Sequence, residues 1–341
     1  MKWISFIVPA YNSEKYLNKC IDSLLVVIED AEIVIINDGS TDHTEKIALD
    51  YQAAYPNAIK VVSKANGGHG SGINKGVEVA SGKYFKVVDS DDWLNEDGIK
   101  DLVYTIKNHQ LNGIEIDMYL TNFVYDKPAE QKQFVRQYHK QFKPHTVLAW
   151  EQVKRFKFSS VILMHAITYK TELLRAFYTP LPHHTFYVDN IYAYQMLPYI
   201  HTIYYTNKLV YHYYIGRADQ SVNRMIFVNR YEQQIRVMHI MLSKFSYNEI
   251  VELPKPLKRY MFFCLSIIMI VTTLFTTANT TYDRKVLLES LWNDLKEKDE
   301  KLYKKLAFRS RLLLINWLPW RVKGLLMTTG YKLLNKMYHF G

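Results

Sequence analysis

Short apolar runs alternate with helical periodicity over the first third of this chain, and this pattern constrains its fold more than any other feature. The apolar runs are rich in β-branched residues, which predicts buried strands at residues 3–8, 33–36, 59–62 and 84–88. Helical spacing between them predicts helices at about 13–24, 42–54, 73–80 and 94–106. Strands alternating with helices indicate βαβ units, so we expect an α/β fold with a parallel sheet.

Polar clusters follow each of the four predicted strands. In an open α/β sheet, ligands bind at the edge formed by the carboxyl ends of the strands. The pattern therefore predicts one polar site at that edge. The clusters occupy residues 9–12, 37–42, 66–76 and 89–92.

The remainder of the chain has a different pattern. We expect mixed strands at 116–125, 133–142 and 202–214, and helices at 150–176 and 187–198. Everything beyond Asn223 is expected to be helical, with a break at Pro254 and Pro256. We therefore expect a catalytic domain at 1–222 and a C-terminal helical region at 223–341.

The four clusters, taken together and in this order, resemble the signature of family 2 glycosyltransferases, which have the GT-A fold, here followed by a C-terminal helical region. The resemblance implies that Pro9, Tyr11 and Asp38 line the pocket for the nucleoside base. It extends donor binding to Asn12, Gly67, Lys75 and Asp89. The segments that carry it are Val8–Asn12, Asn37–Asp42, Asn66–Gly68 with Asn74–Gly76, and Asp89–Asp92.

Two of these clusters have a chemical reading of their own. Asp38 can accept hydrogen bonds from a uracil or ribose, or it can form a turn that caps the following helix. Asp89, Asp91 and Asp92 repel one another unless a cation lies between them, and oxygen ligands suit Mn²⁺ or Mg²⁺. The resemblance implies Asp91 as the main metal ligand, with Asp89 near the metal or ribose. Asp92 could instead cap the helix at 94–106, or the cluster could be a solvated loop.

An inverting transferase also needs a general base. The resemblance places it at Asp189, although Val188 stands where the family usually has a second acid. Asp189 could also serve as the N-cap of its helix. Arg217 could bind the diphosphate or pair with Asp219, and His212 is expected to be a half-buried strand histidine rather than a metal ligand.

The net charge of +10 is concentrated at the end of the chain, because no acidic residue follows Glu300. The segment 301–341 combines its lysines and arginines with leucines and tryptophans, which is typical of a helix that binds an anionic membrane surface. A packed helical hairpin remains an alternative; nucleic acid binding is not expected. The long uncharged segment 260–282 could span a bilayer. Its many Ser and Thr residues and the positive-inside rule favour a buried or interfacial helix.

Together these features predict an inverting, metal-dependent hexosyl- or N-acetylhexosaminyltransferase. It would move a single sugar from a UDP-sugar to a hydroxyl of a glycan, lipid-linked acceptor or cell-surface polysaccharide precursor. Two cysteines without metal-ligand spacing fit a cytoplasmic protein, peripheral on the inner face of the membrane. The alternatives are a non-catalytic sugar-nucleotide-binding module, which Val188 favours, and a nucleotidyltransferase. A nucleotidyltransferase would carry a triphosphate-binding loop after its first strand, and this sequence has no such loop there.

Overall fold

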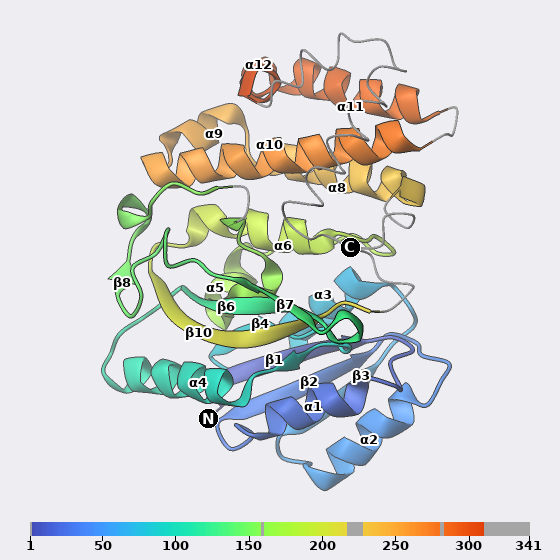
Figure 1. Ribbon diagram of the computed structural model, residues 1–341, viewed down its shortest axis with the longest axis vertical. Helices are drawn as coiled ribbons and strands as arrows, with labels where there is room; N and C mark the ends of the chain where they lie inside the picture. The colour runs from blue at the N-terminus through green and yellow to red at the C-terminus, as the bar shows by residue number, and fades with distance from the viewer. Residues whose placement is uncertain (1, 158–159, 217–227, 280–282, 310–341) are drawn as a thin grey trace. The chain divides into compact units, whose positions relative to one another are not determined.

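The computed structural model describes residues 2–157, 160–216, 228–279 and 283–309 (Figure 1). The chain forms two compact units. Unit 1 comprises residues 1–154 and 162–216, and unit 2 comprises residues 155–161 and 217–341. The expected domain boundary after residue 222 lies outside the described residues.

Unit 1 is built on one mixed sheet with the strand order β3-β2-β1-β4-β9-β6-β10-β5, to which β7 adds beside β6 and β8 beside β10. The strands β1 to β4, β6 and β10 run in one direction, and the others are antiparallel to them. The predicted α/β class is therefore confirmed. The strands are β1 Ile4–Ala10, β2 Ala31–Asn37, β3 Ile59–Ser63, β4 Tyr84–Val87, β5 Trp93–Leu94, β6 Met118–Lys127, β7 Lys132–Arg136, β8 Val147–Leu148, β9 Ile167–Lys170 and β10 Ile203–Tyr214.

Helices cover both faces of this sheet. Figure 1 shows α1, α2 and α4 along one face, and α3, α5 and α6 along the other. Because the sheet is covered on both faces, its central strands are buried and rich in apolar residues, and every residue of β1 and β4 is buried. The helices are α1 Leu17–Leu25, α2 Thr44–Ala54, α3 His69–Val79, α4 Glu96–Leu111, α5 Thr171–Phe177 and α6 Val188–Gln195, with short 3₁₀ turns η1 Pro128–Glu130, η2 Trp150–Gln152, η4 Met164–Ala166 and η5 Leu197–Tyr199.

The helix α3 lies unusually close to β1. A Cβ atom on Gly72 would lie 2.9 Å from Cβ of Pro9, and one on Gly76 would overlap Cγ2 of Ile7. Glycine at these two positions lets the helix backbone approach the strand. This contact places the start of α3 directly beside the end of β1.

Residues 150–176 differ from the expected helix. Among the described residues of this segment only Thr171–Phe177 is an α-helix, and Ile167–Lys170 is β9, inserted antiparallel between β4 and β6. The spacing of apolar residues suggested a helix, but the β-branched and aromatic residues of this short run are buried by two neighbouring strands instead. The strand expected at 133–142 is also shorter and ends at Arg136.

The side chains of Ser13 and Asp92 cap neither of the helices that follow them, α1 and α4. The side chain of Ser13 does not cap α1, whose N-cap is Tyr16. Asn95 caps α4 by accepting from the Gly98 backbone, so the capping alternative for Asp92 is excluded. Asp92 is held elsewhere, as described below. Ser13 and Asp92 are thereby available to organise the loops at the sheet edge.

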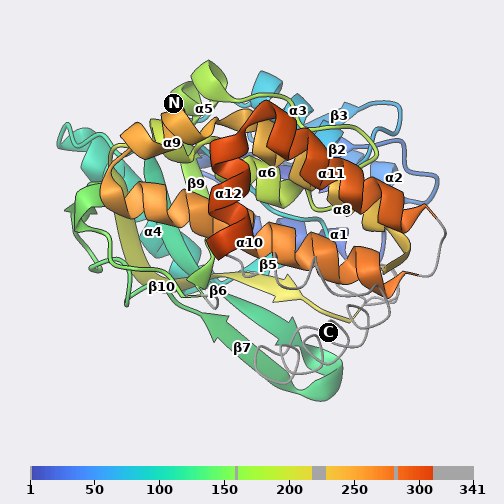
Figure 2. The same cartoon turned by 90° about the horizontal axis from the view of Figure 1, so that it is seen from above.

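Unit 2 is helical, as expected. Its central helix, α10, packs against the four others (Figure 2). Among the described helices, α10 alone is long and apolar enough to cross a bilayer, and 78% of its most apolar window is buried. The helices are α8 Tyr231–Lys244, α9 Tyr247–Glu252, α10 Lys255–Ala278, α11 Arg284–Lys298 and α12 Glu300–Arg309.

The hydroxyls of α10 explain how a helix with so many Ser and Thr residues can be buried. Ser266, Thr272 and Thr277 each donate to the carbonyl four residues earlier, at 2.6–2.7 Å. These bonds satisfy three of the hydroxyls within the helix itself, whereas Oγ1 of Thr273 and of Thr276 is buried without a partner among the described residues. Burial of α10 among its neighbours agrees with the preference for a buried helix over a spanning one.

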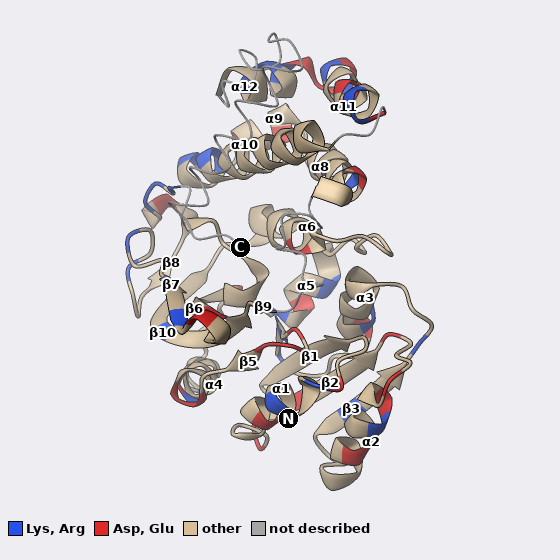
Figure 3. Cartoon of the chain, turned by 45° about the vertical axis from the view of Figure 1, so that its right-hand side comes forward, with Lys and Arg blue, Asp and Glu red and all other residues tan. Residues whose placement is uncertain are grey.

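The first part of the basic tail is also packed. Leu302, Leu306 and Ala307 of α12 are fully or almost fully buried. Figure 3 shows both signs of charge on α11 and α12, while most of α10 carries none. Residues 301–309 therefore belong to the packed helices, and residues 310–341 lie outside the described residues.

Candidate active site

The predicted polar clusters meet at the carboxyl edge of the sheet. The Oγ atoms of Ser13 and Ser90 are 2.7 Å apart, which links the loops after β1 and β4. The side chain of Asn12 accepts from the Thr41 backbone at 2.8 Å, which links the loops after β1 and β2. Asn12, predicted to bind the donor, therefore has a structural role in joining these loops.

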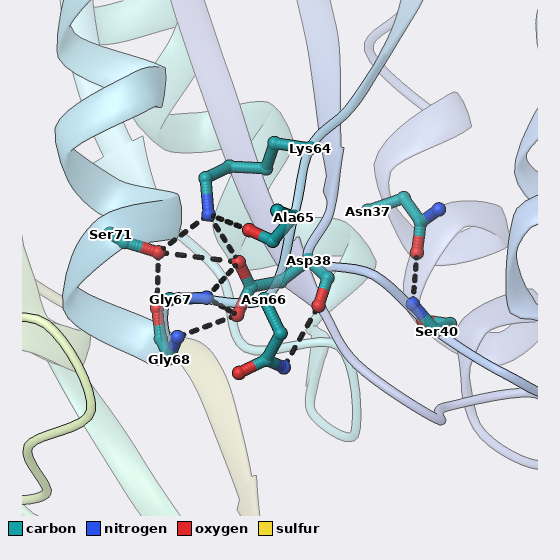
Figure 4. A network of polar contacts seen from close by, with 9 residues as sticks. All are labelled: Asn37, Asp38, Ser40, Lys64, Ala65, Asn66, Gly67, Gly68 and Ser71. Atoms are coloured by element: carbon teal, nitrogen blue, oxygen red, sulfur yellow. Dashed lines mark hydrogen bonds and ion pairs between the residues drawn. The ribbon is translucent and has the colours of Figure 1, made fainter.

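Asp38 lies at the centre of a hydrogen-bond network (Figure 4). Its carboxylate is buried and accepts from the backbone N–H groups of Gly67 and Gly68, with a shortest distance of 2.7 Å. It also accepts from Lys64 Nζ at 2.6 Å and from Ser71 Oγ at 3.2 Å. These donors belong to the loop before α3 and to its first turn, so Asp38 is an anion bound at the N-terminus of that helix.

This network decides whether Asp38 caps the helix that follows it. The alternative that Asp38 caps the following helix, α2, is wrong, because the N-cap of α2 is His43 and the Asp42 side chain accepts from the Thr44 backbone at 2.9 Å beside it. Because the carboxylate already accepts from four groups of its own chain, a nucleotide can bind it only by sharing or displacing one of them. Gly67, predicted to approach the donor, is one of these four.

The other predicted donor residues are spread along this edge. Pro9 is the penultimate residue of β1, and Tyr11 is 50% exposed beside it. Lys75 pairs with Glu78 at 2.7 Å on the outer surface of α3. Asn74, in the same predicted cluster as Lys75, accepts from Tyr178 and Leu181 and donates to the Leu181 carbonyl. Arg217 lies outside the described residues.

The turn after β4 carries the acidic cluster. The Asp89 carboxylate lies 2.7 Å from Nε2 of His69, the first residue of α3. Asp92 is buried, and it accepts from the Tyr211 hydroxyl at 2.5 Å and from the Tyr214 backbone at 2.7 Å. Strand β10 therefore holds the acidic turn in place from the far side.

The carboxylates of this turn titrate differently. Burial raises the pKa of Asp92 well above its usual range, and the charges of Asp91 and Asp89 raise it further. Burial also acts to raise the pKa of Asp89, but the adjacent His69 outweighs it and lowers that pKa. A bound cation relieves the repulsion between crowded carboxylates of this kind.

One group of side chains could hold such a cation. A carboxylate oxygen from Asp89, one from Asp92 and a ring nitrogen of His165 all lie within 4.8 Å of one another. Asp91, the expected main ligand, is half-buried on the same turn and is not part of this group. Oxygen ligands joined by an imidazole suit a divalent ion of the Mn²⁺ type.

Asp189 lies in the first turn of α6, after Tyr187, whose φ is 65°. Burial raises the pKa of Asp189 to about 6; His69 counteracts this, and Asp89 adds to it. The predicted base is therefore close enough to the acidic turn to sense its charge. Val188 is buried, with Cγ2 3.5 Å from where a Cβ on Gly70 would lie, so an acidic side chain here would face the helix α3.

Sequence reasoning missed several residues of this site, namely His69, Lys86, His165 and Tyr211. The lysine within the apolar run of β4 was a signal of a buried polar site, because charged residues are rarely buried unless they are paired. Nothing in the sequence marked His165. His212 is a strand histidine as expected, stacked on Trp93 and 3.1 Å from Asp126.

Comparison with known proteins agrees with this geometry. Residues 5–165 match the sequence model of the family described as Glycosyl transferase family 2. The chain is 38% identical over 117 residues to the uncharacterized glycosyltransferase EpsJ of Bacillus subtilis, which covers 34% of each protein. It is 35% identical over 115 residues to the minor teichoic acid biosynthesis protein GgaB of the same species, covering 33% of this chain and 13% of GgaB.

The fold is also similar to that of a solved structure. S. aureus TarS 1–349, in complex with UDP-GlcNAc, superimposes with a TM-score of 0.55 and 19% sequence identity, and the match covers 91% of this chain and 92% of that one. At this identity the likeness concerns the fold. The sequence matches span about a third of EpsJ and less of GgaB.

Proposed function

Because residues 5–165 belong to glycosyl transferase family 2, we propose that this protein is an inverting glycosyltransferase of bacterial glycan assembly. Its mixed, mostly parallel sheet with helices on both faces is the GT-A fold, as predicted. One observation carries the proposal. Asp38, the acidic turn after β4 and Asp189 all come together at the carboxyl edge of the sheet, with Asp189 close enough for Asp89 to raise its pKa.

The donor is proposed to be a UDP-sugar that carries a hexose or N-acetylhexosamine. The similar TarS fold was solved with UDP-GlcNAc, which supports this class of donor. Pro9, Tyr11 and Asp38 would hold the base, and the glycine-rich loop at Gly67 would approach the rest of the nucleotide. Lys75 and Arg217 remain predicted donor contacts, although Lys75 is engaged by Glu78.

A divalent ion, Mn²⁺ or Mg²⁺, would supply Lewis-acid stabilisation of the leaving diphosphate when bound. Asp89 and Asp91 would hold it from the turn after β4. Tyr211 and Tyr214 fix this turn through Asp92, so the carboxylates keep their position between turnovers. His69 keeps the Asp89 carboxylate oriented from the side of α3.

Asp189 is proposed to remove the proton from the acceptor hydroxyl as the new glycosidic bond forms at the anomeric carbon of the donor sugar. Its raised pKa is well suited to a base near neutral pH, because the group is ionised there yet still basic. Inversion follows from a single displacement with one base. Transfer of a single sugar is proposed because this sequence lacks the Gln-x-x-Arg-Trp motif of family members that have a polymer-translocating channel.

The acceptor is proposed to be a hydroxyl of a glycan or of a lipid-linked polysaccharide precursor. The similarity to GgaB, named for teichoic acid biosynthesis, supports this class. We further propose that the protein works in the cytoplasm at the inner face of the membrane, with the basic segment 310–341 binding anionic lipid.

A panel of UDP-, GDP- and dTDP-sugars tests the function. Release of the free nucleoside diphosphate is measured for each donor, with Mn²⁺ and with or without simple glycan acceptors. We expect UDP-sugars to be consumed and the others to be nearly inert. Tight UDP binding without release from any donor would point to a non-catalytic binding module instead.

A further inference from the structure

His165 is a buried histidine with an unsatisfied atom. The residue is 5% exposed, and its Nδ1 has no hydrogen-bond partner among the described residues. Its ring packs against Tyr211 and Tyr213, with ring centres 5.0 and 4.6 Å away. Buried polar atoms without partners are uncommon in proteins and call for a physical explanation.

The position of His165 is fixed by an unusual lysine. Lys86 of β4 is completely buried, and its Nζ donates to the backbone carbonyls of His165 at 2.7 Å and Ile167 at 3.3 Å. Lys86 precedes Asp89 by three residues on the same strand and turn. The lysine therefore sets His165 at a defined place relative to the acidic cluster.

The two acidic members of the group are fixed as well. Asp92 is held by Tyr211 and Tyr214, and Asp89 by His69. The ligand atoms of Asp89, Asp92 and His165 come from two separate elements, the turn after β4 and the 3₁₀ turn η4, yet lie within 4.8 Å of one another. A rigid, three-sided arrangement of this kind is what a bound cation requires.

We propose that His165 and Asp92 are further ligands of the ion that Asp89 and Asp91 hold from the turn after β4, and that His165 supplies a nitrogen ligand. An imidazole ligand favours a transition-metal ion such as Mn²⁺ over Mg²⁺, which prefers oxygen and keeps much of its water. The site thereby extends inward from the turn that carries Asp91, into the space under Tyr211. The role of the ion in transfer rests on the proposed function, but its binding does not.

The test uses the whole chain with Mn²⁺ and no nucleotide. Pulsed electron paramagnetic resonance of bound Mn²⁺ is expected to show coupling to a directly coordinated ¹⁴N. Protein labelled with ¹⁵N-histidine is expected to show ¹⁵N coupling in its place. A wild-type spectrum without nitrogen coupling would overturn the proposal, and this measurement needs no variant to fold.

The variants then identify the histidine. His165→Gln should lose the nitrogen coupling and bind Mn²⁺ about tenfold or more weakly, while Mg²⁺ binding changes little. His109→Gln is the matched control, because His109 is also a buried histidine but bonds to Tyr119, whose ring contacts that of Tyr84 at the start of β4. It should retain the coupling and the affinity.

The outcomes separate this proposal from the proposed function. Nitrogen coupling that persists in His165→Gln would overturn the ligand assignment, even if UDP-sugar transfer is observed. Nitrogen coupling that is lost only in His165→Gln would support it, even in a protein that transfers no sugar from any donor of the panel.

Discussion

Nε2 of His69 lies 2.7 Å from Oδ1 of Asp89, and this contact joins the first turn of α3 to the acidic turn after β4. Burial acts to lower the pKa of His69, but Asp89, Asp189 and Asp91 outweigh it and raise that pKa. The neighbouring carboxylates thus favour the protonated form of this histidine, which faces both the turn and the proposed base. Its place at the start of a helix packed closely on β1 makes this arrangement rigid.

The pH dependence of transfer should show the ionisation of Asp189. Because burial raises its pKa to about 6, the carboxylate required of a base is lost below that pH. We expect kcat/KM to rise about tenfold per pH unit on the acid side and to level off above about pH 7. Initial rates across this range, at pH values where circular dichroism shows folded protein, provide the measurement. A flat profile through the acid side would exclude Asp189 as the base.

Substitution of the base should separate chemistry from binding. In Asp189→Asn we expect kcat to fall by about 10²- to 10⁴-fold, while the Kd for UDP changes by less than about threefold. Steady-state kinetics and calorimetric titration measure the two effects. Asp117→Asn, at the start of β6 where Asp117 accepts from the backbone of His201 and Thr202, is the control and should keep its rate. A normal transfer rate in Asp189→Asn would show that Asp189 is not the general base.

Asp38 should stabilise the fold as well as the donor pocket. In Asp38→Ala, Lys64 and the N–H groups of Gly67 and Gly68 lose their acceptor, so we expect the free energy of unfolding to fall by about 3 kcal/mol. Urea denaturation measures it. Asp50→Ala breaks an exposed pair with Lys46 and should cost no more than about 0.5 kcal/mol. Equal losses in both variants would contradict the network in Figure 4.

The approach of α3 to β1 predicts an unusual effect of alanine. Gly→Ala within a helix normally stabilises a protein by about 1 kcal/mol. In Gly76→Ala the new Cβ would overlap Ile7, so we expect destabilisation of about 1–3 kcal/mol instead. Thermal unfolding at one protein concentration gives the sign directly. A stabilised variant would show that the helix can move away from the strand.

Deletion of residues 310–341 tests the membrane proposal while leaving the packed helix α12 intact. We expect the shortened protein to lose binding to anionic vesicles and to release UDP from the donor at a nearly normal rate. Sedimentation with vesicles that contain anionic or only neutral lipid measures the first, and donor hydrolysis the second. Undiminished binding to anionic vesicles would place the membrane contact elsewhere in the chain.

Most of unit 1 was predictable because its signals are local. The strands β1 to β4 follow from short apolar runs, and α1 to α4 from helical spacing, although their ends moved by a few residues. The loops that carry Asp38 and Asp89 were identified because polar motifs follow strands, and Asp189 was assigned through the family resemblance. Helix α10 was expected to be buried or interfacial because of its Ser and Thr residues and the positive-inside rule, and it is mostly buried.

The errors arose where a segment depends on distant partners. Residues 167–170 form a strand because they pair with β4 on one side and with β6 on the other. The spacing of apolar residues within this segment does not indicate that pairing. Asn95 rather than Asp92 caps α4, because Tyr211 and Tyr214 of β10 bind Asp92, more than a hundred residues away in sequence.

The sequence alone therefore determined the class of fold, the edge of the sheet at which the polar loops gather and the acidic residues that are proposed to act there. These follow from periodicity and from the fact that parallel strands bring their carboxyl ends to one edge. Only the tertiary structure decided which groups Asp38 binds, how Asp92 is held, and that Lys86 sets His165 beside Asp89. Those relations join residues far apart in the chain, and burial and hydrogen bonding settle them only when the chain is packed.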